Sequence, residues 1–504
     1  MKESRYDILP HKKSSIPHTE LCPKTSASSL SEALDKVQSA SGQNPMEEYL
    51  NQVTSQMRWK KARSYVAQEL SAHIEDQKLA FMDTGMDEEA ALMESIRQMG
   101  DPVAAGTDMD RVHRPSPDWR LLSFIAAFSI LGLIFQYQIC ITASSGQTAG
   151  SSFSLPSQLP GFSLLIHQCA YTIVGIVCMA GIYFADYTII GKYSRSLWWL
   201  SLILLAAAAE ITPVINGGHP GLRIYTYLFA PLYAGLLYRF RHGGWKGLFC
   251  CFFHALFPFL LCAYAINSIR TSFSLAFIFL VMTIAAVVKG WFSVKRRQAI
   301  LILTAVPALS IFIWLFVGFH FGLMPPYQKA RIMALLNLFH DPESISYLSI
   351  AIRQIMSQWR IIGSSMDHIS GFLPDYYYNF VVTFLFTAWG ILPGLLIFGT
   401  YILLFFRIFR TSLCHSGQLG MMTGLSCGLV LASQTFSYIA SNLGYSLYSQ
   451  LSMPFLSYGL STTIVTYVLM GLLLCIHRYK DRELVLAVTL HTWPNLSQNR
   501  FLKP

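Results

Sequence analysis

The side chains in this sequence that could do chemistry inside an apolar environment are uncharged polar groups in its C-terminal part. Residues 411–476 contain no Asp, Glu, Lys or Arg, yet they carry Gln434, Ser457, Tyr458 and Ser461. Each of these side chains can make hydrogen bonds. Lipid offers them no partner, so they should face other helices or a water-filled cavity. Hydrogen bonding between helices is the simpler interpretation of each residue taken singly, and a polar binding cavity is the alternative.

A second set of reactive residues lies in the long stretch between two apolar runs, residues 324–378. Its basic side chains include Lys329, Arg331, Arg353 and Arg360, and its last part carries Asp367 and Asp375. The stretch is far longer than a connection between neighbouring helices needs to be, and long ordered loops are more often functional than idle. Residues 326–337 are expected to form an amphipathic helix at a membrane interface. Contact between the basic side chains and lipid headgroups is one interpretation of this pattern.

The elements that must position these residues are membrane helices. The chain has 504 residues, of which 53% are hydrophobic and only 13% are charged, as is typical of polytopic membrane proteins. Ten apolar runs are close to the roughly 20 residues that cross a hydrocarbon core. We therefore predict an all-α membrane protein with about ten transmembrane helices. The runs are 121–141, 162–184, 197–215, 224–238, 247–266, 271–288, 299–323, 380–406, 421–439 and 455–476.

The basic residues give the orientation. They precede the first apolar run and follow every second run, whereas the connections 142–161 and 440–454 contain no Lys or Arg. Basic loops tend to stay in the cytoplasm, so both termini are predicted to be cytoplasmic. The net charge of +10 is distributed over these loops and forms no single basic patch, which argues against nucleic acid as a partner.

The part before the first run divides into two segments. Residues 1–43 are rich in Ser, Lys and Pro without apolar periodicity, which predicts a disordered cytosolic tail. Residues 44–115 contain helix-capping signals and apolar residues at helical spacing, so they should form a small cytosolic helical domain. Residues 116–478 would then be the membrane domain, and residues 479–504 a second cytosolic tail.

The order of the polar residues resembles the FtsW/RodA/SpoVE family of bacterial cell-wall synthesis, also called SEDS. The family's final motif matches Gln434, Gly444, the run Pro454–Gly459 and Ser461. The large extracytoplasmic loop gives a second match, and together the two cover most of residues 300–478. The loop matches are Pro326-Tyr-Gln, Arg331-Ile332, Asp341-Pro342, Gly363-Ser364 and Gly371–Asp375.

The N-terminal segment has a resemblance of its own. Residues 68–75, 85–90 and 99–102 resemble the short helical prefix modules that precede some Gram-positive membrane proteins. This resemblance implies a regulatory or docking role. A solvated helix bundle without a binding role is the alternative.

The SEDS resemblance implies a chemistry and a partner. The family polymerises lipid II, a polyprenyl-pyrophosphate-linked disaccharide-pentapeptide, on the outer face of the bacterial plasma membrane, together with a single-span class B penicillin-binding transpeptidase. Such a reaction needs a carboxylate to accept the proton of the attacking hydroxyl and cations to hold the pyrophosphate that leaves. By this resemblance Arg331, Arg353 and Arg360 are candidates for the pyrophosphate, because guanidinium binds phosphate oxygens in pairs.

The chain departs from the family at the position that matters most. Asn379 stands where the resemblance places the essential Asp, and a neutral amide cannot act as a general base. Asp375 would lie one turn earlier on the same face if the helix begins early, and Asp367 is a further candidate. No cofactor or metal site is evident from ligand spacing, and a loop-bound divalent cation is left open.

Three functions follow from these observations. The first is a glycosyltransferase of the SEDS type. The second is a catalytically silent scaffold or regulator that keeps a cavity for the lipid-linked precursor, and Asn379 favours it. The third, a lipid II transporter, lacks the charged residues within the apolar runs that coupled transport usually needs.

Overall fold

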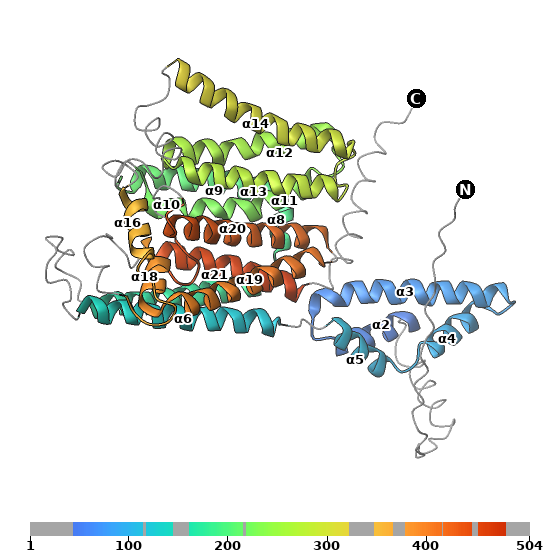
Figure 1. Ribbon diagram of the computed structural model, residues 1–504. Coiled ribbons are helices and arrows are strands. Elements are labelled where there is room, and N and C mark those ends of the chain that lie inside the picture. Colours follow the sequence, from blue (N-terminus) through green and yellow to red (C-terminus); the bar gives the residue numbers. More distant parts are fainter. Residues whose placement is uncertain are drawn as a thin grey trace, which may run out of the picture. The chain divides into compact units, whose positions relative to one another are not determined.

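The computed structural model describes residues 44–113, 117–144, 161–214, 218–321, 347–365, 379–415, 417–445 and 452–479. The regular elements within these ranges are all helices, which confirms the predicted all-α class (Figure 1). The chain divides into two compact units, Met1–Arg114 and Pro115–Pro504.

The described part of the N-terminal unit, residues 44–113, is a bundle of four helices. The side chain of Asn44 caps the first helix by accepting a hydrogen bond from the backbone N–H of Met46. Apolar side chains at helical spacing are buried in its core, including Val53 and Ile74. The helices are α2 (Pro45–Gln56), α3 (Lys60–Asp83), α4 (Glu88–Gln98) and α5 (Pro102–His113).

In the second unit, eight helices of the described part of the chain are long and apolar enough to cross a membrane. The chain is therefore a multi-pass membrane protein. These helices are α6 (Trp119–Ser144), α7 (Gly161–Phe184), α9 (Ser194–Ile211), α12 (Gly244–Leu260) with the π turn η2 (Leu261–Ala265), α13 (Ile269–Val288), α19 (Ile391–Leu413), α20 (Gln418–Asn442) and α21 (Leu460–Arg478).

The two remaining runs of the predicted ten also contain helices. Run 299–323 folds as α14 (Arg296–His320), and run 224–238 folds as a 3-10 turn, η1 (Tyr225–Leu228), followed by α11 (Phe229–Arg239). The described residues also form four shorter helices: α8 (Thr188–Lys192), α10 (Pro220–Arg223), α16 (Tyr347–Met356) and α18 (Val381–Trp389).

The prediction of one continuous helix over 380–406 is wrong. Gly390 has a φ of +97°, a backbone conformation that ends a helix, and it separates α18 from α19. The neighbouring segment 360–365 hydrogen bonds to the backbone at this break, because the N–H of Ile391 donates to the carbonyl of Arg360 (2.9 Å). A Cβ atom on Gly390 would lie 2.8 Å from the carbonyl oxygen of Ile361, so only glycine fits here.

The last predicted run also begins later than expected. α21 starts at Leu460, and residues 452–459 form an irregular segment, which we call the motif loop. Two positive φ angles, +68° at Phe455 and +137° at Gly459, keep this loop out of the helix. Pro454 also disfavours a helical conformation of the residue before it.

The polar C-terminal stretch lies at the centre of the membrane unit. In the most apolar stretch of α20, 78% of the residues are buried, a larger share than in the other seven spans. α21 packs along α7 through glycines: a Cβ on Gly175 would meet the ring of Tyr467, and one on Gly471 would meet the carbonyl of Met179. Small residues let membrane helices approach closely.

A buried ion cluster joins three helices at the end of the unit where α6 begins. Asp118 is 5% exposed, and its carboxylate lies 2.5 Å from Arg407 on α19 and 3.7 Å from His477 on α21. Burial alone would raise the pKa of Asp118. The N–H of Leu121, the guanidinium of Arg407 and the charge of His477 outweigh it and lower this pKa.

We expect Asp118→Asn to destabilise the protein by about 3 kcal/mol at neutral pH, since it leaves Arg407 half-buried without its counter-ion. A lowered pKa gives stability that is present above the unfolded-state pKa of about 3.9 and is lost as pH falls through the folded-state value. The difference in thermal midpoint between wild type and variant should therefore shrink below about pH 4. Glu88→Gln is the control, because Glu88, paired with Lys78, is exposed. An equal loss at every pH would contradict the assignment.

Candidate functional site

The motif loop is held by hydrogen bonds from side chains of the surrounding helices. Tyr401 donates to the carbonyl of Pro454 (2.5 Å), and Gln136 donates to the carbonyl of Leu456 (2.9 Å). Within the loop, Ser457 Oγ accepts a hydrogen bond from the N–H of Met453 (2.8 Å). The described hydrogen bond of Ser457 Oγ thus stays within the loop's own backbone and does not join two helices.

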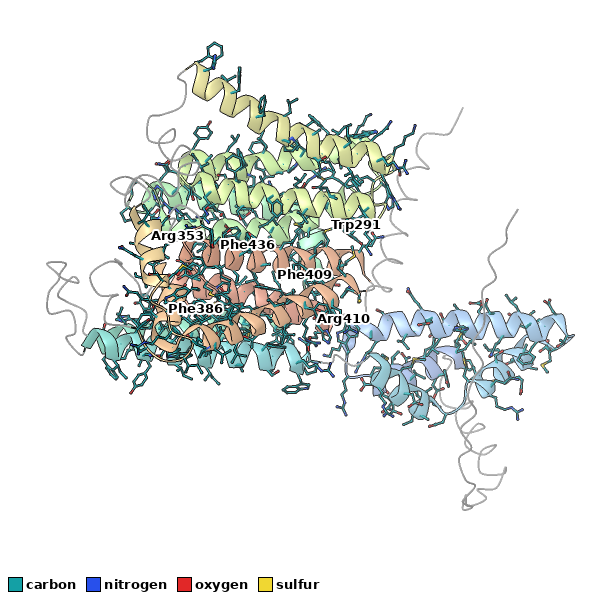
Figure 2. The ribbon with its side chains drawn as sticks, in the orientation of Figure 1. Trp291, Arg353, Phe386, Phe409, Arg410 and Phe436 are labelled. Atoms are coloured by element: carbon teal, nitrogen blue, oxygen red, sulfur yellow. The ribbon has the colours of Figure 1, made fainter. Side chains whose placement is uncertain are left out.

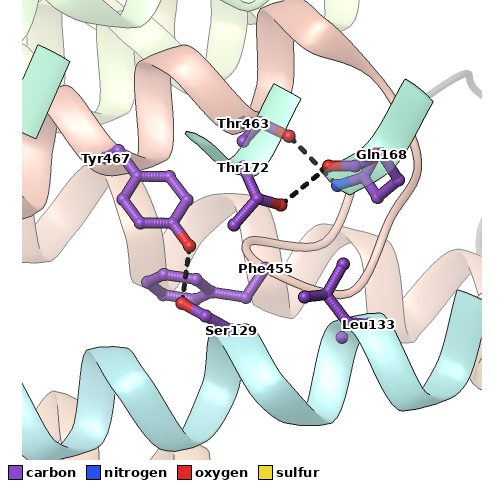
Figure 3. Close-up of a pocket in the computed structure, with 8 residues that line it drawn as sticks. Ser129, Leu133, Gln168, Thr172, Phe455, Thr463 and Tyr467 are labelled. Carbon is purple, nitrogen blue, oxygen red and sulfur yellow. Dashed lines mark hydrogen bonds between the residues drawn. The ribbon is translucent and has the colours of Figure 1, made fainter. Parts of the chain in front are cut away.

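The loop closes against α6 and α7 around a small polar pocket (Figure 3). Gln168 bridges its wall: its Oε1 accepts from the N–H of Gly459 (3.2 Å), and its Nε2 donates to Thr463 Oγ1 (3.4 Å). The pocket has room for about one water molecule. It is therefore far too small for a lipid-linked sugar. Its lining is Ser129, Gly132, Leu133, Gln168, Thr172, Phe455, Thr463 and Tyr467.

The other polar residues predicted from this stretch take different positions. Tyr458 is half-buried, with its ring centroid 5.8 Å from that of Tyr171, and Ser461 lies half-buried in the first turn of α21. Gln434 is on α20 and 2% exposed, and among the described residues its Nε2 has no hydrogen-bond partner. Ser457 and Tyr458 lie in the motif loop and Ser461 directly after it, whereas Gln434 belongs to the core of α20.

Asn379 lies where α18 meets the last turn of α20. It is 5% exposed, and its backbone carbonyl accepts a hydrogen bond from Asn442 Nδ2 (3.1 Å). Its side-chain Oδ1 is buried and has no partner within the described ranges. α18 begins at Val381. Asp375, together with Asp367 and Arg331, lies outside the described residues, so the structure does not place them.

Two of the predicted arginines are described. Arg353 on α16 lies over the ring of Tyr445 at 5.0 Å, next to Gly444, which follows α20 (Figure 2). Arg353 and Asn379 therefore both border the C-terminal end of α20. Arg360 is exposed, and its described role is the backbone hydrogen bond that it accepts at the break before α19.

A second arginine at the end of α20 was not identified from the sequence. Arg270, in the first turn of α13, donates to Ser441 Oγ and to the carbonyl of Ser437, both at 3.1 Å. A cation here is favoured by the partial negative charge of the helix C-terminus. Its signal in the sequence was a single basic residue in a short connection between two apolar runs. We call Arg270, Arg353 and Asn379 the α20-end site.

The α20-end site carries groups of the kind that bind phosphate, but it has no described base. Two guanidinium groups can hold phosphate oxygens, and the free amide oxygen of Asn379 can accept a hydrogen bond. An amide cannot take up a proton at neutral pH. Among the described residues no group of three His, Cys, Asp or Glu side chains could hold a metal ion.

Comparisons with known proteins agree on one family. The family model for the cell cycle proteins FtsW, RodA and SpoVE matches residues 119–482. The probable peptidoglycan glycosyltransferase FtsW of Nitrosomonas europaea is 22% identical over 74% of this chain and 96% of its own length. That of Aliivibrio salmonicida is 23% identical over 76% and 94%.

A solved structure supports the same fold. The chain is similar to one from a study titled "Structural coordination of polymerization and crosslinking by a peptidoglycan synthase complex", with a TM-score of 0.54 and 20% identity. The match covers 73% of this chain and 99% of that one. At this level of identity the likeness concerns the fold.

We expect Gln168→Leu to lower the free energy of unfolding by about 1 kcal/mol, because the half-buried N–H of Gly459 loses its acceptor. Gln168→Glu keeps an acceptor and should cost less if its carboxyl is protonated. Thermal unfolding in detergent measures both. His167→Leu is the matched control on the same helix, since His167 is exposed and bonds within its own turn. Equal effects of Gln168→Leu and His167→Leu would refute the bridging role.

Proposed function

Because the chain belongs to the FtsW/RodA/SpoVE family, whose model matches residues 119–482, we propose that it works in bacterial peptidoglycan synthesis and polymerises lipid II. In this proposal it spans the plasma membrane with both termini in the cytoplasm, in keeping with the basic connections. The end of the unit that carries α16 and the α20-end site then faces outward, where lipid II is used.

The observation that carries the proposal is the α20-end site. Arg270 and Arg353 come from different helices and both contact the C-terminal end of α20. Guanidinium groups there could bind the pyrophosphate of a polyprenyl-linked sugar in a bidentate way. Asn379 Oδ1 could accept a hydrogen bond from a sugar hydroxyl beside them. Arg331 and Arg360 are further candidates for the pyrophosphate.

The base must come from another residue than Asn379. Asp375 precedes it by four residues and Asp367 by twelve. A carboxylate that accepts the hydroxyl proton in the transition state contributes about 100- to 10,000-fold to a rate. We propose Asp375 for this role and Asp367 as the alternative. A loop-bound divalent cation could assist the leaving pyrophosphate, and a single-span class B penicillin-binding transpeptidase is the proposed partner.

A catalytically silent scaffold is the second candidate, and the amide at position 379 specifically favours it. The α20-end site would then still bind the lipid-linked precursor, and the protein would regulate synthesis by other enzymes. Transport of lipid II has no comparable support. In the described parts of the eight spans, charged side chains lie mainly near the helix ends, and coupled transporters usually need them inside.

The test is polymerisation of labelled lipid II by the purified full-length protein, with and without the transpeptidase. We expect polymer from the wild type and a loss of at least about 100-fold in Asp375→Ala, since the base is removed. Glu343→Ala, which removes an acid from the same loop, is the matched control and should retain activity.

Asn379→Asp separates the two candidates. A wild type that binds lipid II without polymerising it, together with polymer formed by Asn379→Asp, would establish the silent scaffold. A wild type that neither binds nor polymerises lipid II would refute both candidates.

A further inference from the structure

We propose that Asn442 is a positioning residue that fixes position 379 and presents its side chain to a hydroxyl or N–H donor of the bound substrate. This inference rests on the proposed function, because it assigns the donor to the lipid-linked sugar. It starts from the first turn of α18, which has no side-chain cap of its own at Phe380. The first N–H groups of a helix have no partner within that helix.

α20 supplies the missing partners from outside α18. The N–H of Val381 donates to the hydroxyl of Tyr438 (2.9 Å), and the N–H of Thr383 donates to Asn442 Oδ1 (3.3 Å). The hydroxyl of Thr383 also donates to the backbone carbonyl of Asn442 (2.8 Å). Helix α18 is thus capped by its neighbour, at the residues directly after Asn379.

Asn442 uses both halves of its amide in this contact. While Oδ1 accepts from Thr383, Nδ2 donates to the carbonyls of Asn379 and Tyr438, both at 3.1 Å. The side chain is only 1% exposed, so each of these groups depends on its protein partner. Aspartate could replace the acceptor but has no donor, and leucine, of similar size, has neither.

The contact holds the backbone of Asn379 and leaves its side chain uncommitted. The carbonyl of Asn379 is bound by Asn442, whereas its Oδ1 is buried without a partner among the described residues. A buried acceptor without a donor is unfavourable, and a ligand that supplies the donor relieves this cost. The geometry therefore assigns Asn442 to holding the backbone of Asn379, and Asn379 Oδ1 to contacting the ligand. Loss of Asn442 should then weaken ligand binding by displacing the side chain of Asn379.

Hydrogen exchange of the full-length protein in lipid nanodiscs tests the first half of this proposal. In Asn442→Leu the amides of residues 381–386 should exchange roughly 10-fold faster or more, because Thr383 loses its acceptor. Asn442→Asp should show a smaller change. Thr435→Val is the matched control, since it removes a buried hydrogen bond on α20 that stays within that helix. Unchanged exchange in Asn442→Leu would overturn the proposal.

Binding of fluorescent lipid II tests the second half. We expect Asn379→Ala and Asn442→Leu each to raise the Kd by about 10-fold, and the double variant to be no weaker than either single one. A double variant weaker by the product of the two factors, about 100-fold, would show independent roles and overturn the coupling. A wild type that does not bind lipid II refutes the proposed function and the ligand assignment together, whereas the exchange result still decides whether Asn442 holds α18.

Discussion

The structure depends on one constraint, namely that lipid cannot hydrogen bond to the backbone. Besides the motif loop, the described part of the membrane unit departs from a continuous helix at Gly390 and at the start of α18. At Gly390 the helix is interrupted, and the backbone of segment 360–365 hydrogen bonds to the backbone groups on both sides of the interruption. At the start of α18, Tyr438 and Asn442 do the same from α20. Tyr438 and Asn442, two polar residues of the most buried span, thus satisfy the irregular backbone beside it.

Hydropathy predicted the fold class and the spans because apolar length alone decides whether a helix can cross a membrane. It could not predict the break at Gly390, since the residues on both sides are equally apolar and the break depends on pairing with a distant segment. The site was predicted in part. Arg353 and Asn379 were identified by resemblance, whereas Arg270 and Asn442 were not, because their roles arise only when α13, α18 and α20 meet.

The amide at position 379 suits the surroundings that the structure gives it. A carboxylate with 5% exposure would need nearby donors or cations to remain charged. Of the neighbouring groups, Asn442 Nδ2 is already bound to backbone carbonyls, and the described contacts of Arg270 and Arg353 are with α20 and Tyr445. An amide carries no charge and avoids this cost. Because an amide is neutral, it also cannot accept a proton at neutral pH. A residue that avoids a buried charge at position 379 therefore cannot act as a general base there.

The cap on α18 also has a consequence for the order of events during synthesis. A chain is made from its N-terminus, so segment 360–365 exists before residues 387–392 and can seal the break at Gly390 as soon as α19 forms. Asn442 is made later, at the end of α20. Until that helix has inserted, the first turn of α18 lacks its partners. In a nascent chain that stops before residue 442, the first turn of α18 should therefore lack the acceptor that Asn442 provides.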